Sequence, residues 1–377
     1  MCSNETGLPI GSTQIREAVF DDYEQITSLL ARNGLATRAK LDWISLWRSN
    51  PAYEELQNRC PIGWVLQTAE GEIVGSVGNI PLACHFRGRK LRAAAGCDWV
   101  VDPRWRRSSM NLLDRLMSQG DTDLFLTTTA SPKSERALKM FDWSRVPVKA
   151  FDRSAFWITS YAGFAKSFLN LKAVPVPGLL CYPVSAALFC RDIFGRNETG
   201  RNRSDSKLEL CTGFDNRFDD FWEELTQQND NVLLPYRTRE TLEWHFRSPL
   251  MRQELTILSK SKGSRMVAYA IFDRQDNPAC GLKRIRLIDF QALKGFESTL
   301  SSAVCWMSRK CRKDSIDMIE NVGAWIDLLK ASKLPKPYYR PLPAALYYYN
   351  VPSKELSDVL NSSAVWAPTT FDGDASL

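Results

Sequence analysis

The stretch Cys97–Met117 changes from strand to helix periodicity, and this change constrains the fold more than any other feature of the chain. Asp98–Asp102 carries Trp and Val, which favour a strand, and Pro103 ends the strand because proline has no N–H to donate. From Ser109 onward apolar residues recur at helical spacing: Met110, Leu112, Leu113, Leu116 and Met117. The sequence therefore predicts a strand, a tight turn and an amphipathic helix in direct succession.

The turn between this strand and helix, Arg104–Ser108, is mostly cationic or hydroxylic. A helix N-terminus presents free backbone N–H groups and a positive dipole end, so a basic turn before it favours an anion. A pyrophosphate is the expected ligand. The alternative is a surface loop of solvated arginines.

Val101–Asn111 also resembles the acyl-CoA-binding turn of the GNAT acyltransferase superfamily, which reads Val-x-Pro-x-aromatic-Arg-x-x-Gly-x-Gly/Ala. The matching residues are Val101, Pro103, Trp105 and Arg106. Ser109 and Asn111 stand where the family prefers glycine or alanine, because the backbone must approach the pyrophosphate closely. Serine is a mild replacement, whereas asparagine is bulkier and crowds the co-substrate.

The resemblance implies a set of residues that bind acetyl-CoA or another acyl-CoA as co-substrate. The pyrophosphate would contact Arg106, Arg107, Ser108, Ser109, Met110 and Asn111, mostly through main-chain N–H groups. Val100 and Val101 would splay from the next parallel strand, Leu126–Thr128, so that the pantetheine arm enters the gap and meets Thr128 and Ser131. The alternative is that both strands are ordinary core.

Asp98 is the candidate general base, because GNAT enzymes often place a carboxylate near this strand to take a proton from the attacking amine. The alternative is a solvent-facing Asp98 or one paired with an arginine. Asp102 is a weaker candidate for the base, because a residue just before Pro103 more often shapes the turn. The family's general acid is commonly a Tyr, but Met140 and Phe141 stand near its expected place.

Composition excludes several classes of protein. A net charge of +6 over 377 residues is far from that of a dedicated nucleic-acid binder. The ten cysteines form no C-x-x-C pair and only two histidines exist, so no metal site is expected, and Cys97, His85 and His245 are expected to be structural. The N-terminus lacks the features of a signal peptide, so we expect a cytoplasmic protein.

The element order predicts an α/β fold of two tandem GNAT-like domains, with mixed central sheets flanked by helices. Residues 1–155 follow the GNAT order and would form the cofactor-binding domain. Residues 208–352 repeat this order weakly, with Trp244–Pro249 echoing Trp47–Pro51, and would form a degenerate copy. Asp289 is followed by no basic turn, so the second copy is expected to have lost the cofactor site.

Two further segments complete the expected organisation. Residues 156–207 would be an apolar connector packed across the two domains, because Ala173–Cys190 carries no charge and its prolines make a membrane-spanning helix costly. A membrane-surface contact of this segment is the alternative. Residues 353–377 would be a polar tail that ends near Asp372-Gly373-Asp374, a feature similar to tandem GNAT proteins encoded near bacterial surface-polysaccharide genes.

The expected activity is acyl-CoA-dependent N- or O-acylation of a small-molecule or sugar-like acceptor. The alternative is a non-catalytic GNAT-like scaffold or metabolite-binding protein, which Ser109, Asn111 and the missing Tyr favour. A third interpretation, binding of RNA or a membrane through Arg104–Arg107 and Arg196–Arg203, depends on charge clusters that usually are solvated faces. The sequence indicates no oligomeric state.

Overall fold

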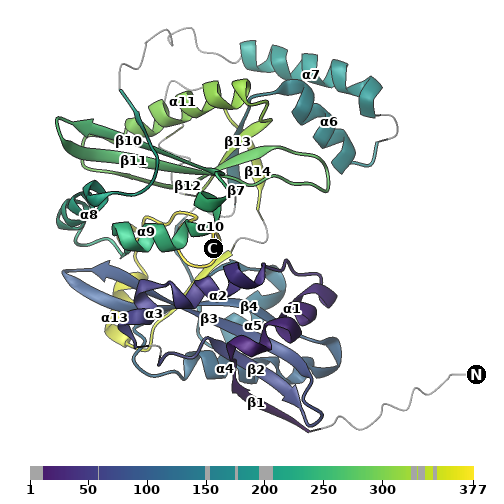
Figure 1. The fold of residues 1–377 in the computed structure, drawn as a ribbon, viewed down its shortest axis with the longest axis vertical. Coiled ribbons are helices and arrows are strands. Elements are labelled where there is room, and N and C mark those ends of the chain that lie inside the picture. The colour runs from purple at the N-terminus through teal and green to yellow at the C-terminus, as the bar shows by residue number, and fades with distance from the viewer. Residues whose placement is uncertain are drawn as a thin grey trace, which may run out of the picture.

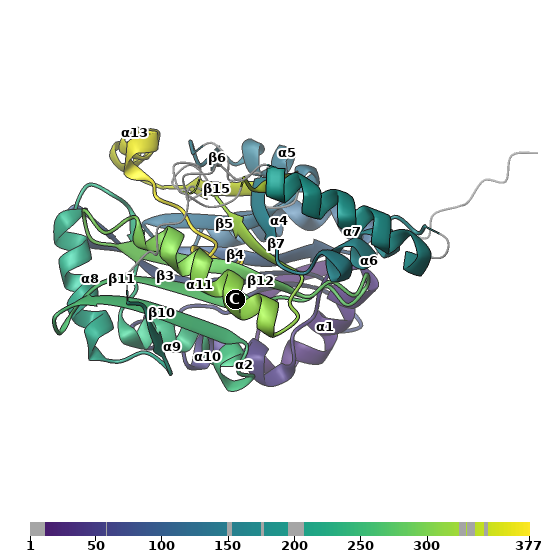
Figure 2. The same cartoon turned by 90° about the horizontal axis from the view of Figure 1, so that it is seen from above.

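The computed structural model describes residues 12–57, 59–148, 153–174, 177–194, 207–323, 329, 336–342 and 346–377. The chain builds two mixed sheets that lie one above the other in Figure 1. Helices flank each sheet, as Figure 2 shows from above. The predicted α/β class, with mixed sheets flanked by helices, is confirmed.

The first sheet has eight strands, and all but one follow in the order β1 (Thr13–Glu17), β2 (Gly63–Thr68), β3 (Ile73–Phe86), β4 (Arg89–Val101), β5 (Leu124–Ala130), β15 (Leu346–Asn350) and β6 (Ser144–Arg145). The eighth strand, β9 (Leu234–Pro235), pairs with β3. Apolar residues cover both faces. One face packs on α1 (Tyr23–Arg32), α2 (Lys40–Arg48) and α3 (Pro51–Glu55), and the other on α4 (Ser109–Met117) and α5 (Pro132–Met140).

The second sheet has seven strands in the order β8 (Glu209–Cys211), β10 (Leu255–Lys262), β11 (Arg265–Arg274), β12 (Arg284–Ala292), β13 (Met318–Val322), β7 (Arg153–Ile158) and β14 (Tyr338–Pro341). Phe218 and Trp222 of α8 (Asn216–Gln228) pack on one face, and Leu300 and Met307 of α11 (Thr299–Lys313) pack on the other. The described part of the chain also forms the helices α6 (Tyr161–Leu171), α7 (Pro177–Phe194), α9 (Arg239–His245), α10 (Arg247–Met251) and α13 (Lys354–Leu360).

The two sheets repeat one strand plan. In each sheet antiparallel strands lead to a long strand, β4 or β12, which pairs in parallel with β5 or β13. The next strand is exchanged: β15 from late in the chain pairs with β5, and β7 from the middle of the chain pairs with β13. The range 208–352 therefore includes two strands of the first sheet, β9 and β15, and the chain crosses between the sheets more than once.

The β4–β5 ladder is short. It pairs Ala93 with Leu124, Ala94 with Phe125 and Ala95 with Leu126, and β4 then continues to Val101 paired with β3 but no longer with β5. In the part of β4 that no longer pairs with β5, Asp98 has a φ of 49°, and the register of β3 against β4 shifts between Ser76 and Gly78. Such a bulge bends a strand and increases its twist, so it steers β4 away from β5.

The C-terminal segment, residues 369–377, crosses from one sheet to the other. The hydroxyl of Thr370 donates to the carbonyl of Ile288 on β12 (2.9 Å), and Asp374 contacts Thr128 on β5. Figure 1 places the C-terminus between the two halves of the molecule. Phe371, Asp372 and Asp374 are buried, so the end of the predicted polar tail is packed as tightly as a core segment.

The apolar stretch of the predicted connector forms a helix in spite of its prolines. Helix α7 runs from Pro177 to Phe194 with Pro183 inside it. It packs against α6, and Leu188 joins a cluster with Phe156 and Met318 of the second sheet rather than packing across the two domains. Among the residues that the structure describes, no helix combines the length and the apolar character needed to span a bilayer.

Candidate functional site

The basic turn lies at the end of β4, as predicted, and helix α4 begins at Ser109. A 3-10 helix, Pro103–Ser108, occupies the turn and is anchored by buried Trp105. Arg106, Arg107 and Asn111 are exposed, whereas Ser108, Ser109 and Met110 are half-buried. The backbone N–H of Ser109 donates to the Arg106 carbonyl, so this predicted anion donor has a partner within the turn.

Asp102 holds the basic turn in place, the role for which the sequence ranked it below Asp98 as a candidate base. Its carboxylate accepts hydrogen bonds from Arg32 (2.6 Å) and Asn33 (2.7 Å) at the end of α1. Burial alone would raise the pKa of Asp102, but these hydrogen bonds outweigh burial and lower it. The charged carboxylate of Asp102 therefore connects the end of α1 to the basic turn.

The predicted gap between β4 and β5 opens beyond Ala95 and Leu126, where their ladder ends. Val100 and Val101 lie on the unpaired side of this point, with Val100 half-buried and Val101 buried against Leu112 of α4. On the other strand, Thr128 is fully buried. β4 and β5 thus separate beyond Ala95 and Leu126, as predicted from the sequence.

Asp374 of the C-terminal segment lies in this gap. Its carboxylate accepts the backbone N–H of Thr128 (2.9 Å), the Thr128 hydroxyl (2.7 Å) and the Thr129 hydroxyl. The Thr128 hydroxyl in turn accepts the backbone N–H groups of Asp374 and Ala375. The donors of Thr128 that were assigned to a pantetheine arm are thus held by the chain itself.

Ser131 also has local partners. It is the N-cap of α5, where its hydroxyl accepts the backbone N–H of Ser134 (3.4 Å). Its own N–H donates to the Ser134 hydroxyl (3.0 Å). A capping box of this kind accounts for a serine at this position by helix stability alone.

Asp98 lies beside Arg38, at 3.2 Å from the carboxylate to the guanidinium. Burial raises the pKa of Asp98, Arg38 opposes the rise, and the nearby Asp374 carboxylate adds to it. A small void lined by Trp43 and Trp47 borders the carboxyl, so apolar rings replace part of its hydration. Asp98 is paired with an arginine, as one alternative expected, and its raised pKa still suits a proton acceptor.

Arg38 is a functional candidate that sequence reasoning missed. Besides Asp98 it donates to the Leu377 carbonyl (3.0 Å), so it ties β4 to the C-terminal segment. It lies between α1 and α2, outside any motif, and only its approach to Asp98 in space identifies it. Cys97, by contrast, is buried and its pKa is raised well above the ordinary thiol value by burial, consistent with a structural thiol.

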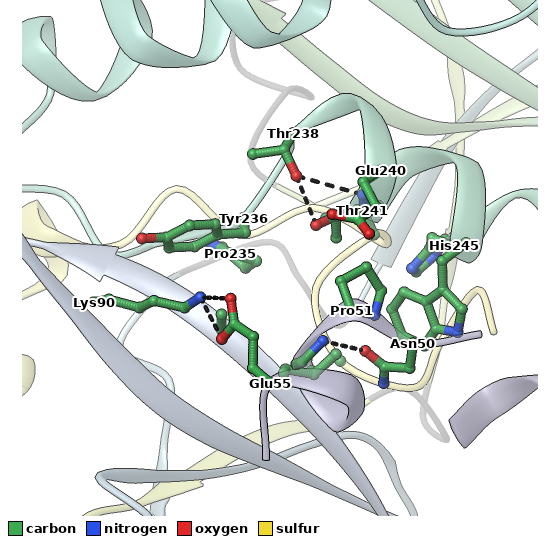
Figure 3. A pocket seen from close by; sticks show the side chains of 16 residues that line it. Asn50, Pro51, Glu55, Lys90, Pro235, Tyr236, Thr238, Glu240, Thr241 and His245 are labelled. Carbon is green, nitrogen blue, oxygen red and sulfur yellow. Dashed lines mark hydrogen bonds and ion pairs between the residues drawn. The ribbon is translucent and has the colours of Figure 1, made fainter. Parts of the chain in front are cut away.

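A cavity of about 150 Å³ lies between the two halves of the chain and is lined by residues of both, as Figure 3 shows from close by. Its lining includes Tyr236, Thr238, Glu240, Thr241, Trp244 and His245 from the second half and Asn50, Glu55 and Lys90 from the first. Lys90 and Glu55 form an ion pair at its exposed edge. Gly373 lines the cavity and abuts Thr128, so the cavity and the gap adjoin at this residue.

His245 closes the cavity as a neutral group. Its Nε2 is 2.7 Å from the Ser376 hydroxyl, and burial lowers its pKa to about 3. Trp244 beside it donates to the Ser45 carbonyl (2.9 Å), which joins α9 to α2 across the two halves. Trp244 lines the cavity, whereas Arg247 is exposed and donates to the Ser49 hydroxyl, and Asp289 is fully buried elsewhere.

The corresponding gap of the second sheet is filled by charges. The β12–β13 ladder ends at Leu287 and Asn321, and Asp289 follows on β12. Its carboxylate pairs with Arg237 (2.9 Å), which also bonds to Asp372 (3.0 Å) of the C-terminal segment. These groups are nearly inaccessible to solvent, and Tyr269 adds a hydrogen bond to Asp289.

Comparison with known proteins bears on the fold. No family model and no curated protein matches the sequence. Among solved structures, a GCN5-related N-acetyltransferase from Anabaena variabilis is 12% identical, with a TM-score of 0.55 over 90% of this chain and 73% of that chain. The N-myristoyltransferase of Saccharomyces cerevisiae with bound myristoyl-CoA and inhibitors is 12% identical, with a TM-score of 0.55 over 92% and 82%.

A third structure, a conserved protein of unknown function from Enterococcus faecalis described as a probable N-acyltransferase, is 11% identical, with a TM-score of 0.53 over 90% of this chain and 73% of that chain. These likenesses extend over both sheets. At such low identity they define architecture and not activity. The chain has a GNAT-like fold.

Proposed function

We propose that this chain is an acyl-CoA-dependent acyltransferase that acylates an amine or hydroxyl of a small or sugar-like acceptor. The observation that carries the proposal is the parting of β4 from β5 beyond Ala95 and Leu126, with a basic turn at the end of β4. An extended acyl-pantetheine can pair with an unpaired strand as a further strand would. The exposed Arg106 and Arg107 would bind its phosphates.

The proposed reaction is direct transfer without a covalent enzyme intermediate. The acceptor nitrogen or oxygen attacks the thioester carbonyl carbon, the carbon–sulfur bond breaks, and the CoA thiolate leaves. Asp98, directly or through water, takes the proton that the acceptor loses, and the proton passes on to the thiolate. Backbone N–H groups of β4 near Val100 polarise the carbonyl oxygen as charge develops on it.

The cavity beside the gap is the proposed acceptor site. Tyr236 and Trp244 offer ring surfaces, and Thr238, Glu240 and Thr241 offer polar groups, a combination suited to an acceptor rich in hydroxyl or amino groups. Replacing Glu240 by Gln should raise the acceptor KM several-fold without changing acyl-CoA binding. Glu243→Gln on the same helix, which is not among the cavity residues, is the control. Equal KM values for both variants would place the acceptor elsewhere.

The test of the proposal is thermal unfolding of the full chain with and without acetyl-CoA or myristoyl-CoA. A ligand at a hundredfold its Kd adds about 2.7 kcal/mol to the free energy of unfolding. The double variant Arg106→Ala/Arg107→Ala should lose most of this gain, whereas Arg89→Ala, at the other end of β4, should keep it. Absence of any stabilisation of the folded protein would overturn the proposal.

The second candidate function is a non-catalytic GNAT-like protein, and the position of Asp374 favours it. The Asp374 carboxylate holds the Thr128 donors within the gap, where a pantetheine arm would otherwise bond. If this contact is permanent, the gap is a structural joint. Failure of acyl-CoA to stabilise both the wild-type chain and a Thr128→Val variant would favour this function.

A further inference from the structure

The hairpin of α6 and α7 has an outer face that no other described part of the chain covers. Phe194, Tyr182 and Leu171 are 86%, 75% and 65% exposed, and Phe168, Leu180, Phe189 and Ile193 are each a little less than half exposed. Figures 1 and 2 show both helices at the outer edge of the second half. A cluster of large apolar side chains at one edge marks an interaction surface rather than scattered surface residues.

The periodicity of α7 separates this outer face from an inner one. Ser185, Leu188 and Asp192 face the body of the protein: Ser185 bonds to the Tyr161 carbonyl, Leu188 packs with Phe156, and Asp192 accepts the hydroxyl of Tyr161. Tyr182, Phe189 and Ile193 recur at helical spacing about a quarter turn around α7 from these residues, and the Phe189 ring also contacts the Tyr161 ring edge-on. The outer stripe is thus a second apolar face, beyond the one that attaches the hairpin.

Charge identifies the kind of partner. Between residues 161 and 194 the charged residues are Lys166, Lys172, Arg191 and Asp192. Asp192 is held by the hydroxyls of Tyr161 and Tyr338 and by Arg191, so its negative charge is neutralised within the hairpin. Lys166 and Lys172 are exposed on α6. The surface therefore combines apolar and aromatic side chains with two lysines that form no ion pair with the described part of the chain, and the Lys172 ammonium lies 6.0 Å from the centroid of the Phe168 ring.

We infer that this outer face binds the surface of an anionic lipid bilayer, with α7 lying in the plane of the interface. Aromatic and aliphatic side chains enter the boundary between headgroups and acyl chains, and lysines beside them attract anionic headgroups. Tyr is favoured at this depth because its ring is apolar and its hydroxyl remains hydrated. A protein partner would need acidic groups opposite Lys166 and Lys172 and is the less economical occupant.

The experiment is co-sedimentation of the full chain with vesicles of phosphatidylcholine alone and with phosphatidylglycerol added. The wild-type chain should bind the anionic vesicles, and added salt should weaken binding. Tyr182→Ser/Phe194→Ser should reduce the affinity roughly tenfold or more, because each ring loses its buried area. Leu41→Ser/Met251→Ser is the matched control, because those side chains are 82% and 77% exposed on other elements.

The charge component has its own variant and control. Lys166→Gln/Lys172→Gln should lower affinity for anionic vesicles by about fivefold per lysine, whereas Lys262→Gln on β10 should leave it unchanged. No sedimentation with anionic vesicles would overturn the inference. A dimer in sedimentation velocity that Tyr182→Ser/Phe194→Ser converts to monomer would also overturn it, because a second copy would then cover the face.

Discussion

The two gaps of this molecule share one strand plan and differ in what fills them. Beyond the β4–β5 ladder, Asp98 pairs with half-buried Arg38 next to an exposed basic turn. Beyond the β12–β13 ladder, Asp289 and Arg237 are sealed from solvent together with Asp372. The same end of a parallel ladder can therefore leave a carboxylate accessible for chemistry or bury it in an ion network.

The difference follows from which segments reach each gap. Thr369, Thr370 and Asp372 of the C-terminal segment pack into the second gap, and Asp374 alone of the carboxylates in that segment reaches the first. No basic turn follows Asp289, so nothing there would hold a pyrophosphate. The interpretation that the second copy has lost the cofactor site stays a prediction, and the structure adds that buried charges lie beyond its ladder.

The largest expected effect is on stability, from Arg237→Ala. Removing this guanidinium leaves Asp289 and Asp372 buried without their cation, which should cost about 3–5 kcal/mol of the free energy of unfolding. Arg38→Ala, which removes a partly exposed partner of Asp98, should cost about 1 kcal/mol or less. Denaturant unfolding of both variants measures the contrast, and equal losses would show that the two gaps do not differ as described.

The next effect concerns activity at the first gap, and it depends on the proposed function. Asp98→Asn should lower kcat about 10²–10⁴-fold with a small change in stability, because the amide cannot accept the proton. Since the pKa of Asp98 is raised, kcat/KM should increase with pH through that raised value as the base ionises. Arg38→Met should move this rise to higher pH, because the guanidinium favours the charged carboxylate. An unchanged pH profile in the Arg38→Met variant would remove Asp98 from the role of base.

The smallest expected effect is on the free energy of unfolding, and it tests how closely the C-terminal segment packs against β5. Gly373 has a φ of 77°, and a Cβ there would lie 2.7 Å from the Thr128 methyl carbon. Gly263 has a φ of 66° but open space around it, so Gly263→Ala carries the backbone cost of about 1–2 kcal/mol alone. Gly373→Ala should cost more by about 1–3 kcal/mol, because Thr128 must also move. Identical losses would mean that the segment does not press on β5.

Sequence reasoning predicted much of the local structure. The period change near Ser109 predicted α4, whose buried residues are Leu112, Leu113 and Leu116. The expected parting of Val100 and Val101 from the strand of Thr128 is present, because a strand that leads into a tight turn carries its own bend. The roles of Asp98, Thr128 and the residues of the basic turn stay predictions.

Partners distant in the sequence were beyond such reasoning. Arg38 reaches Asp98 from a loop that has no motif, and Asp374 reaches Thr128 from the end of the chain. The Asp372-Gly373-Asp374 pattern stood out only as similar to that of other tandem proteins. Its function as a joint between sheets depends on long-range contacts, which short-range spacing does not encode.

The sequence by itself determined the repeated strand plan and the basic turn, because hydrophobic period and local charge act over neighbouring residues. Only the tertiary structure decided that β7 and β15 exchange sheets and that one segment enters both gaps. A strand edge accepts any extended segment of suitable length, so the choice of partner is made by how the whole chain packs.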